Sequence, residues 1–288
     1  MSDKKTNKRK LRIIFFIILV IIAFLLFSLY YGHRLTVKNY VIETNKLTES
    51  IRIVLIADLH SNLYGKNQSR LIGTVIAQNP DIILFAGDIA DDRIKITGTV
   101  DLLEGIADKY PCFYVTGNHE FWSGEVDAVK ELFRSYGVRV LEGENEAVTV
   151  NGQTIIICGI DDPGTRWGYT DEETFNRQLE QAFEGLDGES YTILLTHRPD
   201  RIAGYVPYSP DLVLSGHSHG GQWRIPLILN GLYSPNQGIF PKYAGGIYEY
   251  NGVFMVVSRG LAKYSTPVPR IFNPPELVVI DIIGINEK

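Results

Sequence analysis

Residues 51–60 read IRIVLIADLH, a β-branched apolar run that ends in Asp58 and His60. A run of this length and composition predicts a buried strand over 51–57. The polar side chains that follow it are of types that bind metal ions. The segment therefore predicts a strand whose carboxyl end carries functional groups.

The same arrangement recurs four more times along the chain. Apolar runs precede short polar motifs: DIILFA (81–86) before Gly87-Asp88, PCFYVT (111–116) before Gly117-Asn118-His119-Glu120, YTILLT (191–196) before His197, and DLVLS (211–215) before Gly216-His217-Ser218-His219. Five of the six histidines lie in these motifs. In open α/β folds, functional sites form where the carboxyl ends of strands meet loops. We therefore expect the motifs to meet in one site.

The order of predicted elements indicates an α/β fold with more than one sheet. Helices are predicted over 67–79, 97–109, 124–136 and 171–185, and late strands over 253–258 and 277–283. Residues 138–160 look hairpin-like, with Asn151-Gly152 as the turn. A single doubly wound sheet would not need these hairpins, whereas two packed sheets with helices outside accommodate both halves.

The N-terminal segment 13–31 is apolar all round. It has nineteen residues without a charge, about the length that crosses a bilayer as a helix. Six Lys or Arg residues precede it, so the positive-inside rule places this end in the cytoplasm. A cleaved signal peptide is the alternative, although its apolar region is usually shorter and no clear small-x-small cleavage site follows. We expect a single-pass protein of the cell membrane with a cytoplasmic tail (1–12), a transmembrane anchor (13–31), a lead-in segment (32–50) and an extracytoplasmic catalytic domain (51–288).

The charge balance makes nucleic acid an unlikely class of partner. The whole chain has 28 Lys and Arg against 33 Asp and Glu, and without residues 1–12 the balance is 22 against 32. A nucleic acid backbone needs clustered basic residues, so an acidic domain is a poor match for it. Cys112 and Cys158 both lie inside apolar runs without CxxC spacing, which indicates buried core residues.

Carboxylate, amide and imidazole groups dominate the five motifs. Asp58 and His60 are two residues apart, and in extended backbone such a pair points to one side, as would His217 and His219. The full set of candidate ligands is Asp58, His60, Asp88, Asn118, His197, His217 and His219. Oxygen and nitrogen ligands without a thiolate suit Mn, Fe or Zn. Seven ligands exceed one tetrahedral ion and suit two divalent ions that share a carboxylate, an arrangement used for phosphoryl transfer.

The chain resembles the calcineurin-like metallophosphoesterase family in the ordered motifs D-x-H, G-D, G-N-H-E, H and G-H-x-H, from about Ile51 to Asp281. Two longer strings, GHSHGGQWRIP (216–226) and VSRGLAKYSTPVPRIFNPPEL (257–277), are similar to its membrane-anchored bacterial branch. The resemblance implies a four-layer αββα sandwich, in which helices flank two mixed sheets. It also implies a metal-dependent phosphoric ester hydrolase, while it is weakly specific for the substrate.

The resemblance further implies a role for each residue. Asp58, His60 and His219 would bind a first metal ion, Asn118, His197 and His217 a second, and Asp88 would bridge them. His119 would be the general acid while a metal-bridging hydroxide attacks the phosphorus. Asp91, which follows Asp88 in the family's GDxxD pattern, would orient His119. The adjacent Asp92 has no role in the pattern, and an exposed turn residue is expected there.

Phosphodiesters are the favoured substrates, and lipid-linked phosphates are candidates because of the predicted location. One alternative is a pyrophosphohydrolase that acts on an acylated UDP-sugar, as some relatives in the family do. Another is a non-enzymatic metal-binding scaffold, against which the complete ligand set argues. A nuclease of the same superfamily is disfavoured by the acidic domain and the anchor. The sequence leaves the oligomeric state open.

Residues 225–250 form a long stretch rich in Gly, Pro and Tyr directly after the last histidine motif. Loops of this length inside a domain are often functional. An ordinary buried excursion is one interpretation of its apolar part, 226–233. The other is an apolar lip that touches the bilayer or a lipid tail, because the anchor holds the domain close to the membrane.

Overall fold

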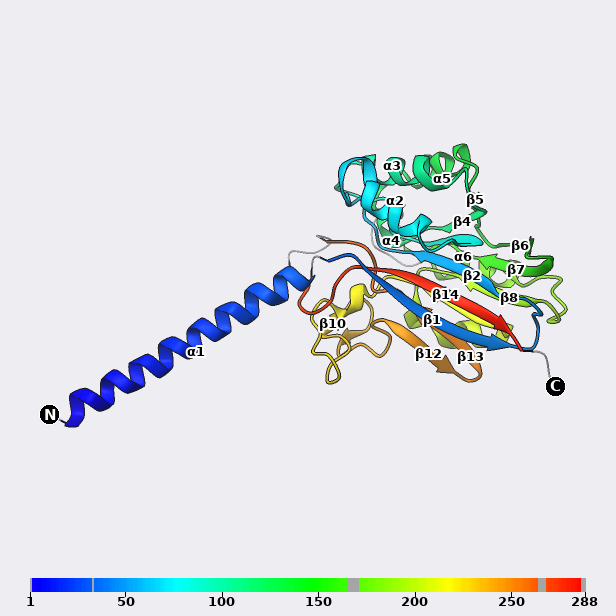
Figure 1. Ribbon diagram of the computed structural model, residues 1–288. Coiled ribbons are helices and arrows are strands. Elements are labelled where there is room, and N and C mark those ends of the chain that lie inside the picture. Colours follow the sequence, from blue (N-terminus) through cyan, green and yellow to red (C-terminus); the bar gives the residue numbers. More distant parts are fainter. Residues whose placement is uncertain (1, 33, 165–170, 264–267, 286–288) are drawn as a thin grey trace.

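Two six-stranded mixed sheets organise the chain in the computed structural model, which describes residues 2–32, 34–164, 171–263 and 268–285 (Figure 1). The first sheet has, in spatial order, β1 (Thr36–Thr44), β14 (Glu276–Gly284), β2 (Ile51–Ile56), β3 (Ile82–Ala86), β4 (Cys112–Val115) and β5 (Arg139–Val140). The second has β12 (Gly246–Tyr250), β13 (Val253–Val257), β9 (Leu212–Ser215), β8 (Tyr191–Leu195), β7 (Gln153–Gly159) and β6 (Glu144–Val150).

Alternating side chains of the strands build three separate layers of core. Ile53 and Leu55 of β2 pack toward the second sheet, in a cluster that also contains Ile193 of β8. The residues between them, Val54 and Ile56, point outward and pack against helices. This alternation follows from the two-residue period of a strand, and it places an apolar face on both sides of each sheet.

Helices cover both outer faces, which completes the four layers. The first sheet is covered by α2 (Ser69–Ile76), α3 (Thr97–Ile106) and α5 (Val126–Ser135), and the second by α6 (Glu172–Ala182) and α7 (Ile202–Tyr205). Among the described residues the domain has one further α-helix, α4 (Asn118–Ser123), and a small two-stranded sheet joins β10 (Tyr233–Ser234) to β11 (Gly238–Ile239). The predicted αββα sandwich is confirmed.

Most predicted elements agree with the structure to within a few residues, and two do not. The β6–β7 hairpin turns at Asn151-Gly152, where both residues have positive φ as a type I′ turn requires. The earlier part of the hairpin-like region is different, because β5 pairs in parallel with β4 and extends the first sheet. Helix α4 was not predicted; it ends at Gly124, whose φ of 73° separates it from α5.

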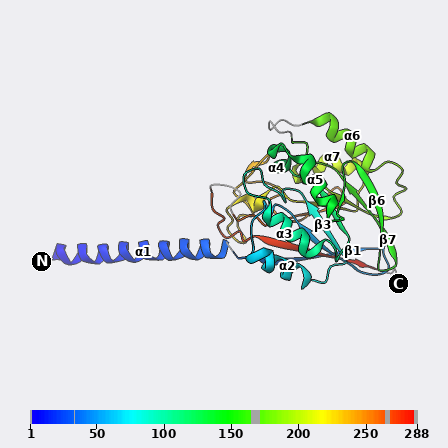
Figure 2. The same cartoon turned by 90° about the horizontal axis from the view of Figure 1, so that it is seen from above.

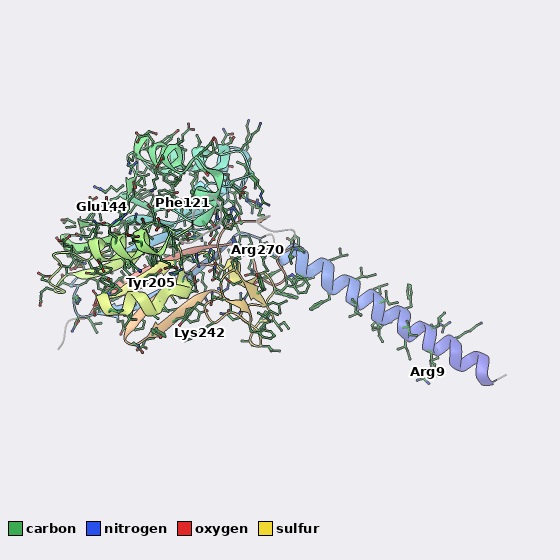
Figure 3. The ribbon with its side chains drawn as sticks, turned by 180° about the vertical axis from the view of Figure 1, so that it is seen from behind. Arg9, Phe121, Glu144, Tyr205, Lys242 and Arg270 are labelled. Carbon is green, nitrogen blue, oxygen red and sulfur yellow. The ribbon has the colours of Figure 1, made fainter. Side chains whose placement is uncertain are left out.

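The N-terminal helix α1 (Ser2–Gly32) leaves one end of the domain, as Figures 1 and 2 both show. Its segment Lys8–Gly32 is long and apolar enough to cross a membrane. The last turns touch the domain: the ring of Phe272 lies 5.1 Å from that of Phe24 and 6.4 Å from that of Tyr31. Arg270 lies close to the same junction (Figure 3). Beyond it, β1 pairs with β14 over nine residues, so the lead-in segment forms an edge strand of the first sheet.

Candidate metal centre

The turns that follow β2, β3, β8 and β9 bring buried His and Asp side chains together. One group consists of Asp58, His60, Asp88 and His219, and a second of Asp88, His197 and His217. Within each group the potential ligand atoms lie within 4.8 Å of one another. Asp88 belongs to both groups, so the arrangement is compatible with two metal ions that share one carboxylate.

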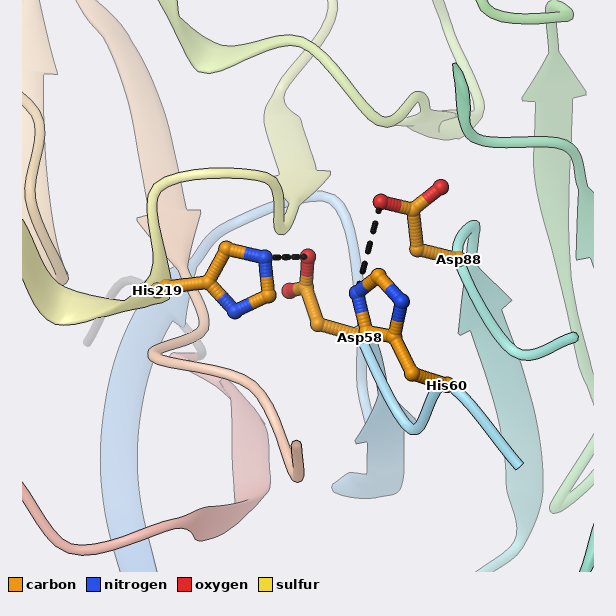
Figure 4. A group of neighbouring side chains, drawn as sticks. All are labelled: Asp58, His60, Asp88 and His219. Carbon is orange, nitrogen blue, oxygen red and sulfur yellow. Dashed lines mark ion pairs between the residues drawn. The ribbon is translucent and has the colours of Figure 1, made fainter. Parts of the chain in front are cut away.

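Short distances define the first group, shown in Figure 4. His60 Nε2 lies 3.6 Å from Asp88 Oδ2, and His219 Nε2 lies 3.6 Å from Asp58 Oδ1. Asp58 is held in place by the backbone N–H of His217, which donates to Oδ1 at 2.9 Å. All of these side chains are almost completely buried.

The second group is equally close. His197 Nε2 lies 3.2 Å from Asp88 Oδ2 and 3.1 Å from His217 Nδ1. The other nitrogen of His197 is 2.7 Å from the carbonyl oxygen of Ala86, which requires Nδ1–H and leaves Nε2 to face the centre. Asn118, the remaining candidate ligand, is buried at the first position of α4.

Left-handed backbone turns aim these side chains, which corrects the expectation of extended pairs. The φ angles of Asp58, His60, Asp88, His217 and His219 lie between 46° and 68°. This region is sparsely populated by residues other than glycine, and it concentrates at functional sites. As a result His217 and His219 do not share a group: His217 faces His197, whereas His219 faces Asp58.

The structure also changes the partners assigned to Asp91 and Asp92. Asp91 Oδ2 lies 2.8 Å from Nδ1 of His60, so this carboxylate orients a candidate ligand. The nearest carboxylate to His119 is that of Asp92, with 2.7 Å between Oδ1 and Nδ1, compared with 3.6 Å for Asp91. Asp92 is therefore not an exposed turn residue. Spacing along the chain could not separate two adjacent carboxylates on a turn.

His119 lies at the edge of the centre. Its backbone N–H donates to Asp88 Oδ1 at 2.8 Å, which ties the start of α4 to the shared carboxylate. Its ring stands edge-on to that of His60, with 4.4 Å between centroids, and contacts the ring of Trp122 at 4.7 Å. The side chain is partly exposed, so a molecule in the site can reach it.

Glu120 joins the two turns that carry Asp88 and Asn118, a role that its motif did not reveal. The carboxylate accepts four backbone N–H bonds of 2.8–3.0 Å, from Asp88, Ile89, Ala90 and Gly117. Each oxygen accepts two of them, and the residue is completely buried. The signal in the sequence is only that an acidic residue follows Asn118-His119, which does not say where its oxygens point.

We expect Glu120→Gln to destabilise the fold by about 3 kcal/mol, because the amide NH2 replaces the acceptor of two buried N–H groups. The measurement is thermal unfolding of the metal-free full chain in detergent, followed by tryptophan fluorescence. It is made above the pKa of Glu120, which burial and the charge of Asp88 raise to about 7. Glu125→Gln is the control, since Glu125 is exposed and the change of charge is the same. Equal melting temperatures for the two variants would contradict the role of Glu120.

Electrostatics favour a cation at the centre. Burial raises the pKa of Asp58 to about 6, since the charged form loses its hydration there. Burial alone would lower the pKa of His197, but the carboxylate of Asp88 outweighs it and raises that pKa to about 10. In the absence of a metal, a proton on His197 thus offsets the buried negative charge, and a divalent cation would replace it.

Two buried polar atoms support the same assignment. His60 Nε2 and Asn118 Oδ1 have no hydrogen-bond partner within the described part of the chain. A buried polar group without a partner costs free energy, so such atoms need an explanation, and a role as metal ligands is one. Imidazole nitrogen and amide or carboxylate oxygen are ligands suited to Mn, Fe or Zn. The residues present therefore fit a dinuclear centre.

Comparisons with known proteins agree with this geometry. A family model described as calcineurin-like phosphoesterase matches residues 51–221. An uncharacterized metallophosphoesterase of Aquifex aeolicus is 33% identical over 258 residues, which cover 87% of this chain and 92% of that protein. A transmembrane protein with metallophosphoesterase domain from Danio rerio is 30% identical over 251 residues, which cover 83% of this chain and 55% of that protein.

The fold has a counterpart among solved structures. The crystal structure of TT1561 of Thermus thermophilus has a TM-score of 0.52 at 12% identity, over 74% of this chain and 91% of that chain. The chain belongs to the calcineurin-like phosphoesterase family. The family resemblance read from the motifs is confirmed. The apolar helix α1, together with relatives that are named transmembrane proteins, indicates a membrane protein.

Proposed function

We propose that the protein hydrolyses phosphodiester bonds at a centre of two divalent metal ions. The observation that carries the proposal is the position of Asp88, which belongs to both ligand groups while His119 lies beside it. When bound, the two ions supply Lewis acidity toward the phosphoryl group and toward water. We further propose that α1 anchors the chain by a single pass, with the basic N-terminus in the cytoplasm and the catalytic domain outside.

Each side chain has a defined part in this proposal. Asp58, His60 and His219 would hold the first ion, Asn118, His197 and His217 would hold the second, and Asp88 would contribute to both. Asp91 fixes the ring of His60 through Nδ1, which leaves Nε2 as the nitrogen that would bind the ion. Asp92 holds Nδ1 of His119, which leaves Nε2 as the nitrogen that donates a proton to the leaving oxygen.

Substitutions of the two adjacent aspartates should therefore have different effects. We expect Asp91→Asn to weaken metal affinity by about 10–100-fold, because it removes the partner that orients a ligand. We expect Asp92→Asn to lower turnover by about tenfold or more with metal content unchanged, because it releases the proton donor. Metal titration and saturating-metal turnover measure the two effects separately. The reverse pattern would return Asp91 to the role that the family motif assigns to it.

The proposed activity is tested with the full chain in detergent, stripped of metal and reloaded with Mn, Zn, Fe or Mg in turn. Turnover of bis(p-nitrophenyl) phosphate is compared with that of p-nitrophenyl phosphate. We expect metal-dependent cleavage that favours the diester and is abolished by removal of the metal. Preference for the monoester would overturn the diesterase. Two bound ions without cleavage of either ester would favour a narrow pyrophosphohydrolase or a binding scaffold.

A further inference from the structure

The stretch 223–240, here called the apolar segment, turns large apolar side chains to solvent. The side chain of Leu227 is fully exposed, that of Ile228 is 83% exposed and that of Phe240 is 67% exposed. Four others are also exposed: Trp223, Ile225, Tyr233 and Ile239. These exposures contradict an ordinary buried excursion. A soluble surface rarely carries so many apolar groups on one short segment, so the segment needs a partner that covers it.

The apolar segment is built as two short tips. A bridge between Ile225 and Leu229 closes the first tip and presents Leu227 and Ile228. Pairing of β10 with β11 closes the second, and Phe240 follows it. Backbone bonds hold both tips to the end of the last histidine motif, as when Leu232 donates to the carbonyl oxygen of Gly221. The exposed side chains thus stand on a defined scaffold.

The apolar segment continues directly from the contact between the anchor and the domain. Trp223 pairs with Ile271, and its indole N–H donates to the carbonyl oxygen of Pro269 at 3.0 Å. The next residue after Ile271 is Phe272, whose ring packs on Phe24 of α1. In Figures 1 and 2 the loops around β10 accordingly lie at the end of the domain from which α1 leaves.

The depth of this contact points to the bilayer as the partner. Phe24 precedes Gly32 by eight residues, about 12 Å along the helix axis. A bilayer that covers the uncharged run 13–31 therefore also covers the level at which Phe272 meets Phe24. The β-bridge between Trp223 and Ile271 places the start of the apolar segment next to the contact between Phe272 and Phe24. Trp223 and Tyr233 are residue types enriched at membrane interfaces.

The charge of the apolar segment differs from that of the rest of the domain. Residues 223–241 contain Arg224 and no Asp or Glu, whereas the chain after residue 12 has 32 acidic residues against 22 basic ones. An anionic lipid surface repels acidic groups and attracts basic ones. A stretch without acidic residues avoids this repulsion, which is compatible with contact between the segment and such a surface.

The same segment reaches the metal centre. Asn236, at the turn between β10 and β11, has its Oδ1 2.8 Å from Nε2 of His217. The neighbouring Gln237 donates from Nε2 to Ser218 Oγ at 3.1 Å. The apolar segment therefore connects the end of the domain that contacts α1 with His217, a candidate metal ligand. If the segment lies in the membrane, its depth there fixes the distance between the metal centre and the lipid headgroups.

We propose that the apolar segment inserts into the interface of the bilayer that α1 spans and holds the metal centre toward the headgroups, so that the substrate is a phosphoester carried by a lipid. The insertion rests on α1 crossing the membrane. The substrate class rests, in addition, on the proposed phosphodiesterase. Two readouts keep these parts separate, since the first needs no catalysis.

The first readout is the depth of a label. Full-chain Leu227→Cys and Phe240→Cys, labelled with the fluorophore NBD, are reconstituted in nanodiscs of phosphatidylcholine and phosphatidylglycerol, with and without brominated acyl chains. The native Cys112 and Cys158 are buried, and the unsubstituted protein measures their labelling. Glu131→Cys on α5 is the matched control, because Glu131 is exposed and α5 lies away from α1 in Figure 1.

We expect brominated lipid to quench the labels at positions 227 and 240 by about half or more, and the control label hardly at all. Equal quenching at all three positions, or at none, overturns the insertion. Labels that are shielded from water but not quenched, in particles that contain two chains, also overturn it, because a second copy would then cover the segment.

The second readout is a ratio of rates. Full-chain Leu227→Ser/Ile228→Ser in the same nanodiscs is assayed on bis(p-nitrophenyl) phosphate and on phosphatidyl-p-nitrophenol, which share a leaving group. We expect the lipid rate to fall by about tenfold and the soluble rate by less than about twofold, because only the lipid depends on the position of the segment. Equal loss on both overturns the lipid substrate. If the labels are quenched but the unsubstituted protein cleaves neither ester, the proposed hydrolase activity is wrong. The proposed insertion of the segment is still supported in that case.

Discussion

Asp88→Asn should lower turnover by about a thousandfold or more, because it removes the one carboxylate that both ligand groups share. Removing a charge that holds two cations is expected to cost several kcal/mol of transition-state stabilisation, and 1.4 kcal/mol corresponds to about tenfold in rate. Metal analysis of the purified variant should show fewer than two ions per chain. The amide keeps the volume of the side chain, so the buried turn is disturbed little.

The control for Asp88 is a carboxylate of similar burial outside the two ligand groups. Asp161 accepts a hydrogen bond from Thr116 Oγ1 at 2.7 Å and pairs with Lys130 at 2.8 Å. Asp161→Asn should lower the melting temperature through the lost ion pair and leave two bound ions. If Asp88→Asn kept two ions and near-normal turnover, a dinuclear centre bridged by this residue would be ruled out.

His119→Ala should lower turnover by about 10²–10⁴-fold while both ions stay bound, since a general acid contributes about this much. The ring of His119 touches that of His60, but its Nδ1 contacts Asp92 and not a ligand. The loss should depend on the leaving group. Nitrophenolate leaves without a proton, so an alkyl or glyceryl diester should suffer more than bis(p-nitrophenyl) phosphate.

A plot of the rate of His119→Ala against leaving-group pKa separates this role from a structural one. Trp122→Ala is a useful comparison, because Trp122 packs on His119 and its indole N–H can donate a hydrogen bond but does not give up its proton to a leaving oxygen. It should lower all rates by a similar factor. A loss in His119→Ala that is the same for good and poor leaving groups would exclude proton donation and point to charge stabilisation of the phosphate.

The buried strands and their sequence along the chain could be predicted because the information is local, whereas β10, β11 and β12 lie in the stretch 225–250 that was expected to be a loop. Each buried strand is a contiguous β-branched run, and Asn151-Gly152 supports positive φ at a two-residue turn. Helix α4 was missed since the stretch NHEFWS is only six residues long and shows no apolar period. Likewise β5 is two residues long, and only its pairing with β4 assigns it to the first sheet.

The residue types at the centre could also be predicted, but their geometry could not. The motifs placed His and Asp at strand ends, and the structure brings these side chains within reach of one another. The family resemblance implied how they group, but the direction of each side chain depends on left-handed turns at Asp58, Asp88 and His217, which residue spacing does not encode. The partners of Asp91 and Asp92 depend on how the turn after β3 packs against α4. The backbone hydrogen bonds that the Glu120 carboxylate accepts depend on the same packing.

By itself, the sequence determined the family, the layered fold, the apolar N-terminal helix and the set of chemical groups, because alternation, uncharged length and ordered motifs are properties of neighbouring residues. Tertiary structure alone decided that Asp91 faces His60 while Asp92 faces His119, and that 223–240 lies exposed beside the anchor. These features arise where segments far apart in the chain meet, such as Trp223 on Ile271 and Phe272 on Phe24. A pattern of neighbouring residues cannot predict such contacts, because their energy depends on both segments.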